Sequence, residues 1–147
     1  MVVLAFPLAL AAQAPAKPTK ADKCPVCGMF VYKYPDWIAQ AHFKDGQVFF
    51  FDGAKDMFKF LENVKKYASK NDRKDVSSTL VMEYYDLTYI PAQSAWFVMG
   101  SDVYGPMGKE LIPFAKEADA KGFLKDHKGT SVLTFDQVTP EVLKKLE

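Results

Sequence analysis

The order of strand and helix signals runs through the same cycle twice, and this repetition constrains the fold of the chain more than any other feature. In the first cycle, the alternating residues 37–43 and the apolar run 47–51 flank an Asp-Gly turn signal, which predicts a β-hairpin. Apolar residues then recur at helical spacing over 54–67, with Asp52 as the expected N-cap, and β-favouring residues follow at 79–87. The first cycle is therefore strand, strand, helix, strand.

The second cycle has the same order as the first. It predicts strands and one helix at 94–99, 109–113, 117–126 (the helix) and 131–135. Thr139 as N-cap followed by Pro140 predicts a short helix near the end of the chain. We therefore expect an α+β fold, with two similar ββαβ halves in one compact unit and a short C-terminal helix.

The N-terminal residues resemble a secretory signal. The segment 1–12 is almost wholly apolar, and Ala12-Gln13-Ala14 is a small-x-small sequence that suits a signal peptidase. The apolar run is too short to cross a bilayer, which takes about 20 residues. We expect a signal peptide at 1–14, a flexible leader at 15–23, and one domain at 24–147 with halves near 24–90 and 91–147. The protein is then periplasmic, and meets the membrane only if the signal stays uncleaved.

The charge balance bears on the class of partner. Nineteen Lys and Arg residues against 18 Asp and Glu residues leave a formal net charge of +1. Binding to nucleic acid depends on a basic field around the phosphates, which this balance does not supply. We therefore expect no nucleic acid partner.

The segment Cys24-Pro25-Val26-Cys27-Gly28-Met29 contains the only two cysteines of the chain. Thiolate and thioether sulfurs are soft donors, which favour Cu(I) over hard cations. If Gly28 is extended, the side chains of Cys27 and Met29 share one side of the backbone. A Cys24–Cys27 disulfide would close too small a loop to stabilise the fold much, so the pair indicates metal ligands or a redox couple.

A second sulfur lies far downstream, in Gly105-Pro106-Met107-Gly108. Met107 stands after a proline and before a glycine in a predicted turn, where a long apolar side chain has little to pack against. It is either a metal ligand or a side chain that covers the core from a loop. Met57 and Met82, in the predicted helix and strand, are expected to be core residues.

Two other functions fit the cysteines less well. A structural zinc site takes four nitrogen or sulfur ligands, and only His42 and His127 remain to complete it, each expected at the surface or at a helix end. A thiol–disulfide oxidoreductase could use Cys24 and Cys27 in a Cys-Pro-x-Cys motif. That motif normally opens a helix, whereas residues 30–32 look extended. With no nucleophile–base pair in evidence either, we expect a protein that is not an enzyme.

Several separated motifs together resemble the NosL family, the copper-binding accessory proteins of nitrous oxide reductase. They are Cys27-Gly28-Met29, Tyr34-Pro35-Asp36-Trp37, Phe51-Asp52-Gly53, and Gly100-Ser101 leading into Gly105-Pro106-Met107-Gly108. The resemblance covers roughly residues 23–135. It implies two ββαβ halves, a fold related to that of organomercurial lyase, and a periplasmic Cu(I) carrier that delivers copper to the reductase or its assembly machinery. The family also has relatives outside denitrification.

The resemblance also implies a ligand set. The Cys-x-Met pair of the family maps onto Cys27 and Met29, and its downstream methionine maps onto Met107. Cys24 is either a further ligand or a resolving thiol that protects Cys27 by reversible oxidation. The expected metal residues are thus Cys24, Cys27, Met29 and Met107. The chain departs from the family in one respect, since many members carry a lipoprotein signal and no cysteine closely follows the apolar run here.

Overall fold

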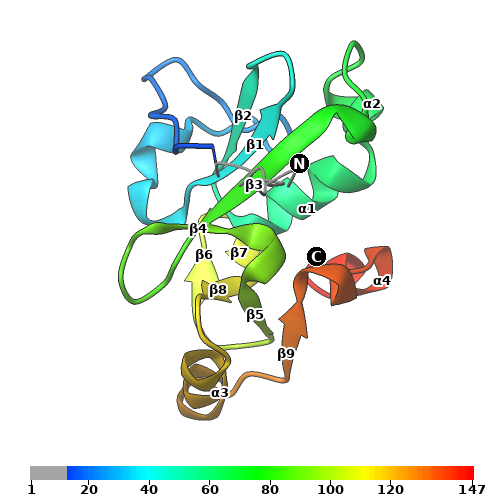
Figure 1. The fold of residues 1–147 in the computed structure, drawn as a ribbon. Coiled ribbons are helices and arrows are strands. Elements are labelled where there is room, and N and C mark those ends of the chain that lie inside the picture. Colours follow the sequence, from blue (N-terminus) through cyan, green and yellow to red (C-terminus); the bar gives the residue numbers. More distant parts are fainter. Residues whose placement is uncertain (1–12) are drawn as a thin grey trace, which may run out of the picture.

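Two antiparallel sheets, one from each half of the chain, form the framework of the protein (Figure 1). This computed structural model describes residues 13–147; residues 1–12, and with them most of the expected signal peptide, lie outside the described residues. The first sheet has the strand order β2-β1-β3-β4, made of β1 (Ala39–Phe43), β2 (Val48–Phe51), β3 (Val76–Met82) and β4 (Tyr89–Pro91). Between β2 and β3 the chain forms α1 (Ala54–Glu62) and α2 (Val64–Tyr67).

The second sheet repeats the topology of the first. Its order is β8-β5-β9, made of β5 (Trp96–Met99), β8 (Ile112–Phe114) and β9 (Ser131–Thr134), with α3 (Glu117–Asp126) between β8 and β9. In both sheets the first strand of the half is central, with the second strand on one side and the third on the other. The two ββαβ halves expected from the sequence are therefore confirmed, as is a short last helix, α4 (Pro140–Lys144), capped by the Thr139 side chain.

The connection between the first two strands differs between the halves. In the first half a short turn joins β1 to β2, whereas the second half inserts a small hairpin of β6 (Tyr104–Gly105) and β7 (Gly108–Lys109) between β5 and β8. The predicted strand 109–113 is therefore wrong as a single element. Short 3₁₀ helices complete the described chain: η1 (Val31–Lys33), η2 (Pro35–Trp37), η3 (Arg73–Asp75), η4 (Ala92–Ser94) and η5 (Phe135–Gln137).

Polar side chains move two of the predicted element ends. The predicted helix 54–67 is divided at Asn63, whose backbone is not helical and whose side chain accepts a hydrogen bond from the Lys66 amide to begin α2. The third strand ends at Met82 because the buried Glu83 carboxylate accepts hydrogen bonds from the Tyr85 and Asp86 amides and turns the chain. Both elements are thus shorter than their apolar pattern suggested.

The main core lies between the first sheet and α1. It contains the fully buried side chains of Phe43, Phe51, Met57 and Phe60, and α4 packs Leu143 against the same cluster. The position of Met57 confirms its expected role as a core residue. A second cluster around Phe114 and Phe123 fills the space between the second sheet and α3. The Phe58 and Phe97 rings, with centroids 5.2 Å apart, join the two halves.

Strand β1 is buried along its whole length, on both faces of the sheet. Its polar residues are satisfied internally, because His42 Nε2 lies 2.8 Å from Gln40 Oε1. Gln40 also accepts from the Ala16 amide and donates to the Ala16 carbonyl, at 3.0 and 2.8 Å. Residues 13–18 form no helix or strand, yet the leader is held on the sheet by this buried amide. The expectation that His42 lies at the surface is wrong, and burial lowers the pKa of its imidazole.

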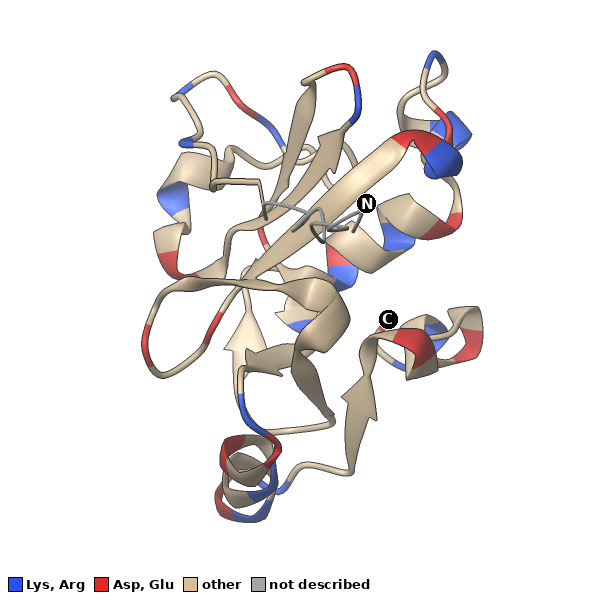
Figure 2. Ribbon diagram, viewed as in Figure 1, with Lys and Arg blue, Asp and Glu red and all other residues tan. Residues whose placement is uncertain are grey.

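Acidic and basic residues are interspersed along the helices and loops in Figure 2, most clearly on α3 and around α2. Within residues 13–147, none of the helices combines the length and the apolar character that crossing a bilayer requires.

Candidate metal centre

The two cysteines lie in a tight loop that folds back on itself. Residues Lys23 and Phe30 pair as an isolated antiparallel bridge, and within the loop the Cys24 amide donates to the Met29 carbonyl at 2.9 Å. The Gly28 amide donates to the Cys24 carbonyl at 2.8 Å, with Gly28 at φ +79°. This left-handed conformation favours glycine, and it means that Gly28 is not extended. Cys27 and Met29 are therefore related by a turn rather than by strand alternation.

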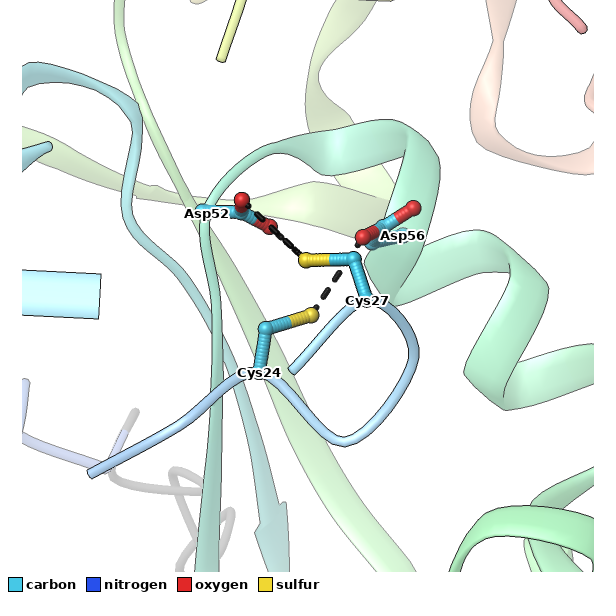
Figure 3. A group of neighbouring side chains, drawn as sticks. All are labelled: Cys24, Cys27, Asp52 and Asp56. Atoms are coloured by element: carbon cyan, nitrogen blue, oxygen red, sulfur yellow. Dashed lines mark hydrogen bonds between the residues drawn. The ribbon is translucent and has the colours of Figure 1, made fainter. Parts of the chain in front are cut away.

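Four side chains from two parts of the first half meet at this loop. The Cys24 and Cys27 thiols point toward the Asp52 and Asp56 carboxylates, which lie at the end of β2 and in the first turn of α1 (Figure 3). Cys24 Sγ donates to Asp56 Oδ2 at 3.3 Å, and Cys27 Sγ lies 3.2 and 3.3 Å from the two oxygens of Asp52. One donor atom from each of the four residues lies within 4.8 Å of all the others.

The sequence places the two carboxylates through simple local rules. Asp52 directly follows the apolar strand β2, and Asp56 comes four residues later, in the first turn of α1. The predicted N-cap role of Asp52 is wrong, because Gly53 is the N-cap residue and the Asp52 carboxylate accepts from Cys27 instead. Both aspartates are almost fully buried, with exposed fractions of 1% and 4%.

Burial disfavours ionisation of the Cys24 and Cys27 thiols. Burial, reinforced by the Asp56 charge, raises the pKa of Cys24 well above its usual range. Burial also raises the pKa of Cys27 to about 12, with the Asp52 carboxylate contributing in the same direction. The pKa of Asp52 is itself raised, chiefly by burial. Without a cation, both thiols therefore hold their protons at neutral pH.

These protonated thiols bear on the redox alternative. A reactive disulfide-exchange thiol has a lowered pKa, commonly at the N-terminus of a helix. Here the thiol pKa values are raised and the loop is followed by the 3₁₀ turn η1, not by an α-helix. Of the predicted extended segment 30–32, Phe30 is extended but Val31 and Tyr32 belong to η1, and the consequence for the redox motif is unchanged. The surroundings of Cys24 and Cys27 therefore argue against a role as a thiol–disulfide oxidoreductase.

The donor set fits a single metal ion. Sulfur and oxygen ligands bind at about 2.0–2.3 Å, so two ligands of one ion are at most roughly 4.6 Å apart. The four donor atoms already lie within 4.8 Å of one another, so small side-chain movements would bring them onto one ion. A cation there would offset the negative charge of the thiolates and carboxylates and would release the thiol protons.

The structure brings some of the predicted site residues together and leaves one at the surface. Cys24 and Cys27 both belong to the group of four donors, and the half-buried Met29 lies in the same loop. Met107 is 44% exposed, in the turn between β6 and β7. Asp52 and Asp56 were missed; the signal was an acidic residue directly after a wholly apolar strand, followed by another four residues later.

Neither histidine belongs to the group of four donors. His42 is buried in β1 beside Gln40. His127 is the C-cap residue of α3, where its Nδ1 lies 2.9 Å from Asp102 Oδ1 and its ring stacks on Phe123. The helix-end position expected for His127 is confirmed.

A cluster from the second half packs against the start of α1. Glu110 Oε1 accepts from the Lys55 amide at 2.7 Å and from the Leu111 amide at 2.8 Å. The Glu110 carboxylate also fills the space that a side chain at position 53 would need, so a larger residue there would have to displace it. The Lys55 ammonium donates to the Met107 and Lys109 carbonyls at 2.9 and 2.6 Å. The hairpin that carries Met107 is thus joined to the helix that carries Asp56.

The buried Glu110 makes the stability of the fold depend on pH. Burial raises its pKa to about 8, against the opposing effect of the two amide donors. An acid with a raised pKa in the folded state is held protonated there while the unfolded chain ionises, so stability falls as pH rises from about 4.5 to 8. We expect Glu110→Gln, which cannot ionise but keeps the acceptor oxygen, to remove a loss on the order of 5 kcal/mol across this window.

Urea unfolding at several pH values across this window checks that expectation. The exposed Glu62→Gln on α1 is the control, and it should keep the slope of the wild type. Parallel stability curves for the wild type and Glu110→Gln would show that Glu110 is already ionised in the fold.

The fold and the site together define a class: small α+β proteins of two ββαβ halves with a candidate metal centre at the start of the first helix. A family model narrows this class. The NosL model matches residues 15–143, nearly the whole described chain, and the chain belongs to the NosL family.

Individual relatives agree with this assignment. The copper-binding lipoprotein NosL of Stutzerimonas stutzeri is 32% identical over 124 residues, which make up 84% of this chain; the match spans 65% of the length of that relative. The crystal structure of the copper chaperone NosL from Shewanella denitrificans superposes with a TM-score of 0.72 and 28% identity, over 88% of this chain and 97% of the other. The names of both relatives describe binding or carriage of copper rather than catalysis, in agreement with the expectation of a protein that is not an enzyme.

A second solved structure shares the fold. The solution structure of apo-NosL from Achromobacter cycloclastes has a TM-score of 0.51 and 21% identity, over 71% of this chain and 87% of the other.

Proposed function

We propose that this chain is an exported Cu(I)-binding metallochaperone that delivers copper to a periplasmic copper enzyme or its assembly machinery, with nitrous oxide reductase as the client. The observation that carries the proposal is the pair of thiols, one buried and one half-buried, whose sulfurs lie within 4.8 Å of each other and of two buried carboxylates in a NosL-family chain. One relative is named a copper-binding lipoprotein and another a copper chaperone. Both names support copper as the metal that is carried, and the name lipoprotein supports export from the cytoplasm.

The proposed ligands are Cys24, Cys27, Met29 and Met107. Sulfur donors suit Cu(I), which accepts low coordination numbers and prefers soft ligands over carboxylate oxygen. Asp52 and Asp56 hydrogen-bond the thiols of the metal-free protein. When copper binds, the thiol protons leave for solvent, and the two thiolates then supply the negative charge that faces the metal.

The exposure of the four sulfur residues suggests a direction for release. Cys24 is buried, Cys27 and Met29 are half-buried, and Met107 is exposed. A carrier must give up its cargo, and ligand exchange begins most easily where a ligand of the partner can approach. In this proposal Met107 is the weaker, outermost ligand, which a ligand of the recipient replaces first.

An air-free titration tests the proposal. Reduced protein is expected to bind one equivalent of Cu(I), and Met107→Ala should weaken the affinity about tenfold while the fold stays intact, because one thioether is lost from an exposed position. Competition with a chromophoric Cu(I) chelator gives the affinity, and circular dichroism checks the fold.

Tyr104→Ala is the matched control, since it removes another exposed side chain from the same hairpin without removing a sulfur. It should bind copper as the wild type does. Equal affinities of Met107→Ala and wild type would remove Met107 from the ligand set. The redox alternative instead predicts disulfide reductase activity that needs Cys24 and Cys27 and is indifferent to Met29 and Met107.

A further inference from the structure

Lys55 occupies an unusual place for a lysine. It is 4% exposed, and its ammonium is directed at two backbone carbonyls, those of Met107 and Lys109, on either side of Gly108. A lysine near a surface ordinarily extends its charged end into water, and burial of that charge has a cost in free energy. The hydrogen bonds of Lys55 are therefore made to one particular turn of the chain.

The backbone of Lys55 makes a second link to the same segment. Its amide is one of those at a helix N-terminus that have no partner within the helix, and it donates to Glu110 Oε1 at 2.7 Å. Both nitrogens of one residue thus bind residues 107–110, which belong to the other half of the protein.

The turn that Lys55 contacts belongs to a very short hairpin. Strands β6 and β7 contain two residues each, and the turn between them includes the exposed Met107 and Gly108 at φ +85°. Short hairpins of this kind are not stable on their own. In the sequence, Lys55 stands between Asp52 and Asp56, the two residues that accept hydrogen bonds from the thiols.

We propose that Lys55 is a positioning residue, which holds the Met107 turn against the first turn of α1 and so determines how the Met107 thioether reaches the metal centre. The inference rests on the proposed role of Met107 as a ligand. In this proposal the buried Lys55 ammonium joins the two halves of the protein at the site. Its contacts are with backbone carbonyls, so they do not depend on the side chain at position 107.

The first test uses copper-free protein. In Lys55→Met, which keeps the apolar stem and removes the ammonium, the backbone order parameters of Gly108 and Lys109 should fall from about 0.85, typical of rigid backbone, to below about 0.6. Lys59→Met is the matched control, one turn further along α1, because the Lys59 ammonium contacts Glu147 at 3.2 Å instead of the hairpin. It should leave the turn rigid. A rigid turn in Lys55→Met would overturn the positioning role.

The second test is a double-mutant cycle on Cu(I) affinity. Lys55→Met should weaken binding about tenfold, as Met107→Ala does, and the double variant should be no weaker than Met107→Ala alone. Losses that multiply would overturn the inference, because a residue acting through Met107 has no effect once its sulfur is gone. If Lys55→Met does not fold, Lys55→Gln, whose donor ends one bond shorter, carries the same expectations.

The two proposals fail in different ways. Wild-type affinity in Met107→Ala would overturn the ligand role of Met107, and with it any influence of Lys55 on the metal. Unchanged mobility of the turn in Lys55→Met would overturn the positioning role alone and leave the ligand assignment standing.

Discussion

Replacing Cys27 by serine is expected to abolish most Cu(I) binding, with a loss of affinity of about 100-fold or more. The serine hydroxyl can still donate to Asp52, as the thiol does at 3.2 Å, so the metal-free pocket should keep its shape. What the variant lacks is a thiolate that can bind the cation. Removal of one partner of a buried charge pair typically costs about 3–5 kcal/mol, which corresponds to at least two orders of magnitude in affinity. Competition with a chromophoric chelator under anaerobic conditions measures the loss.

Two further variants serve as a control for Cys27→Ser and as a test of the role of Cys24. Val26→Ala changes the same loop without touching a donor atom, and it should bind as the wild type does. Cys24→Ser separates the two roles left open for Cys24: a ligand loses affinity on the scale of Cys27→Ser, whereas a protective thiol does not. If Cys27→Ser binds copper as tightly as the wild type, the site assignment is wrong.

The affinity for Cu(I) is expected to rise steeply with pH. The pKa of Cys27 is raised to about 12 and that of Cys24 is raised further above its ordinary value, chiefly because both thiols are buried. Both therefore carry a proton in the metal-free protein throughout the neutral range, and each thiolate that binds copper must first lose it. With two thiolate ligands, the apparent affinity should increase about 100-fold per pH unit, and with one about tenfold.

Chelator competition at a series of pH values between about 6 and 9 measures this slope. Cys24→Ser should reduce the exponent by one if Cys24 is a ligand, and Met107→Ala should shift the whole line without changing its slope, because a thioether carries no proton. An affinity independent of pH across the range would exclude thiolate ligands.

The repeated fold could be read from the sequence because its signals are local. Strand alternation, the Asp-Gly turn and the helical spacing of apolar residues each act over a few neighbours, and α3 lies at the predicted residues, 117–126. The errors have nonlocal or side-chain causes. Gln40 and His42 are polar residues in an alternating strand, yet both are buried, because the leader crosses β1 and pairs with Gln40 through Ala16.

The candidate site was visible only in part. The thiols could be recognised because the chain has only two cysteines and they are close together in the sequence. Asp52 and Asp56 do not, since acids near a helix start are common as caps. Their contacts with Cys27 and Cys24 span 25 and 32 residues of sequence, a separation that only the packing of the loop against α1 brings together.

The insertion of β6 and β7 between β5 and β8 makes the two ββαβ halves contribute differently to the candidate site. The first half supplies the two thiols and two carboxylates, while the second contributes a small flap, the β6–β7 hairpin, at a place where its counterpart has only a short turn between β1 and β2. Because this flap lies outside the ladders of both sheets, its length and composition can vary without altering the strand register of either. Under the proposed function, the hairpin that carries Met107 can therefore change how firmly copper is held without changing the strand pairing of either sheet.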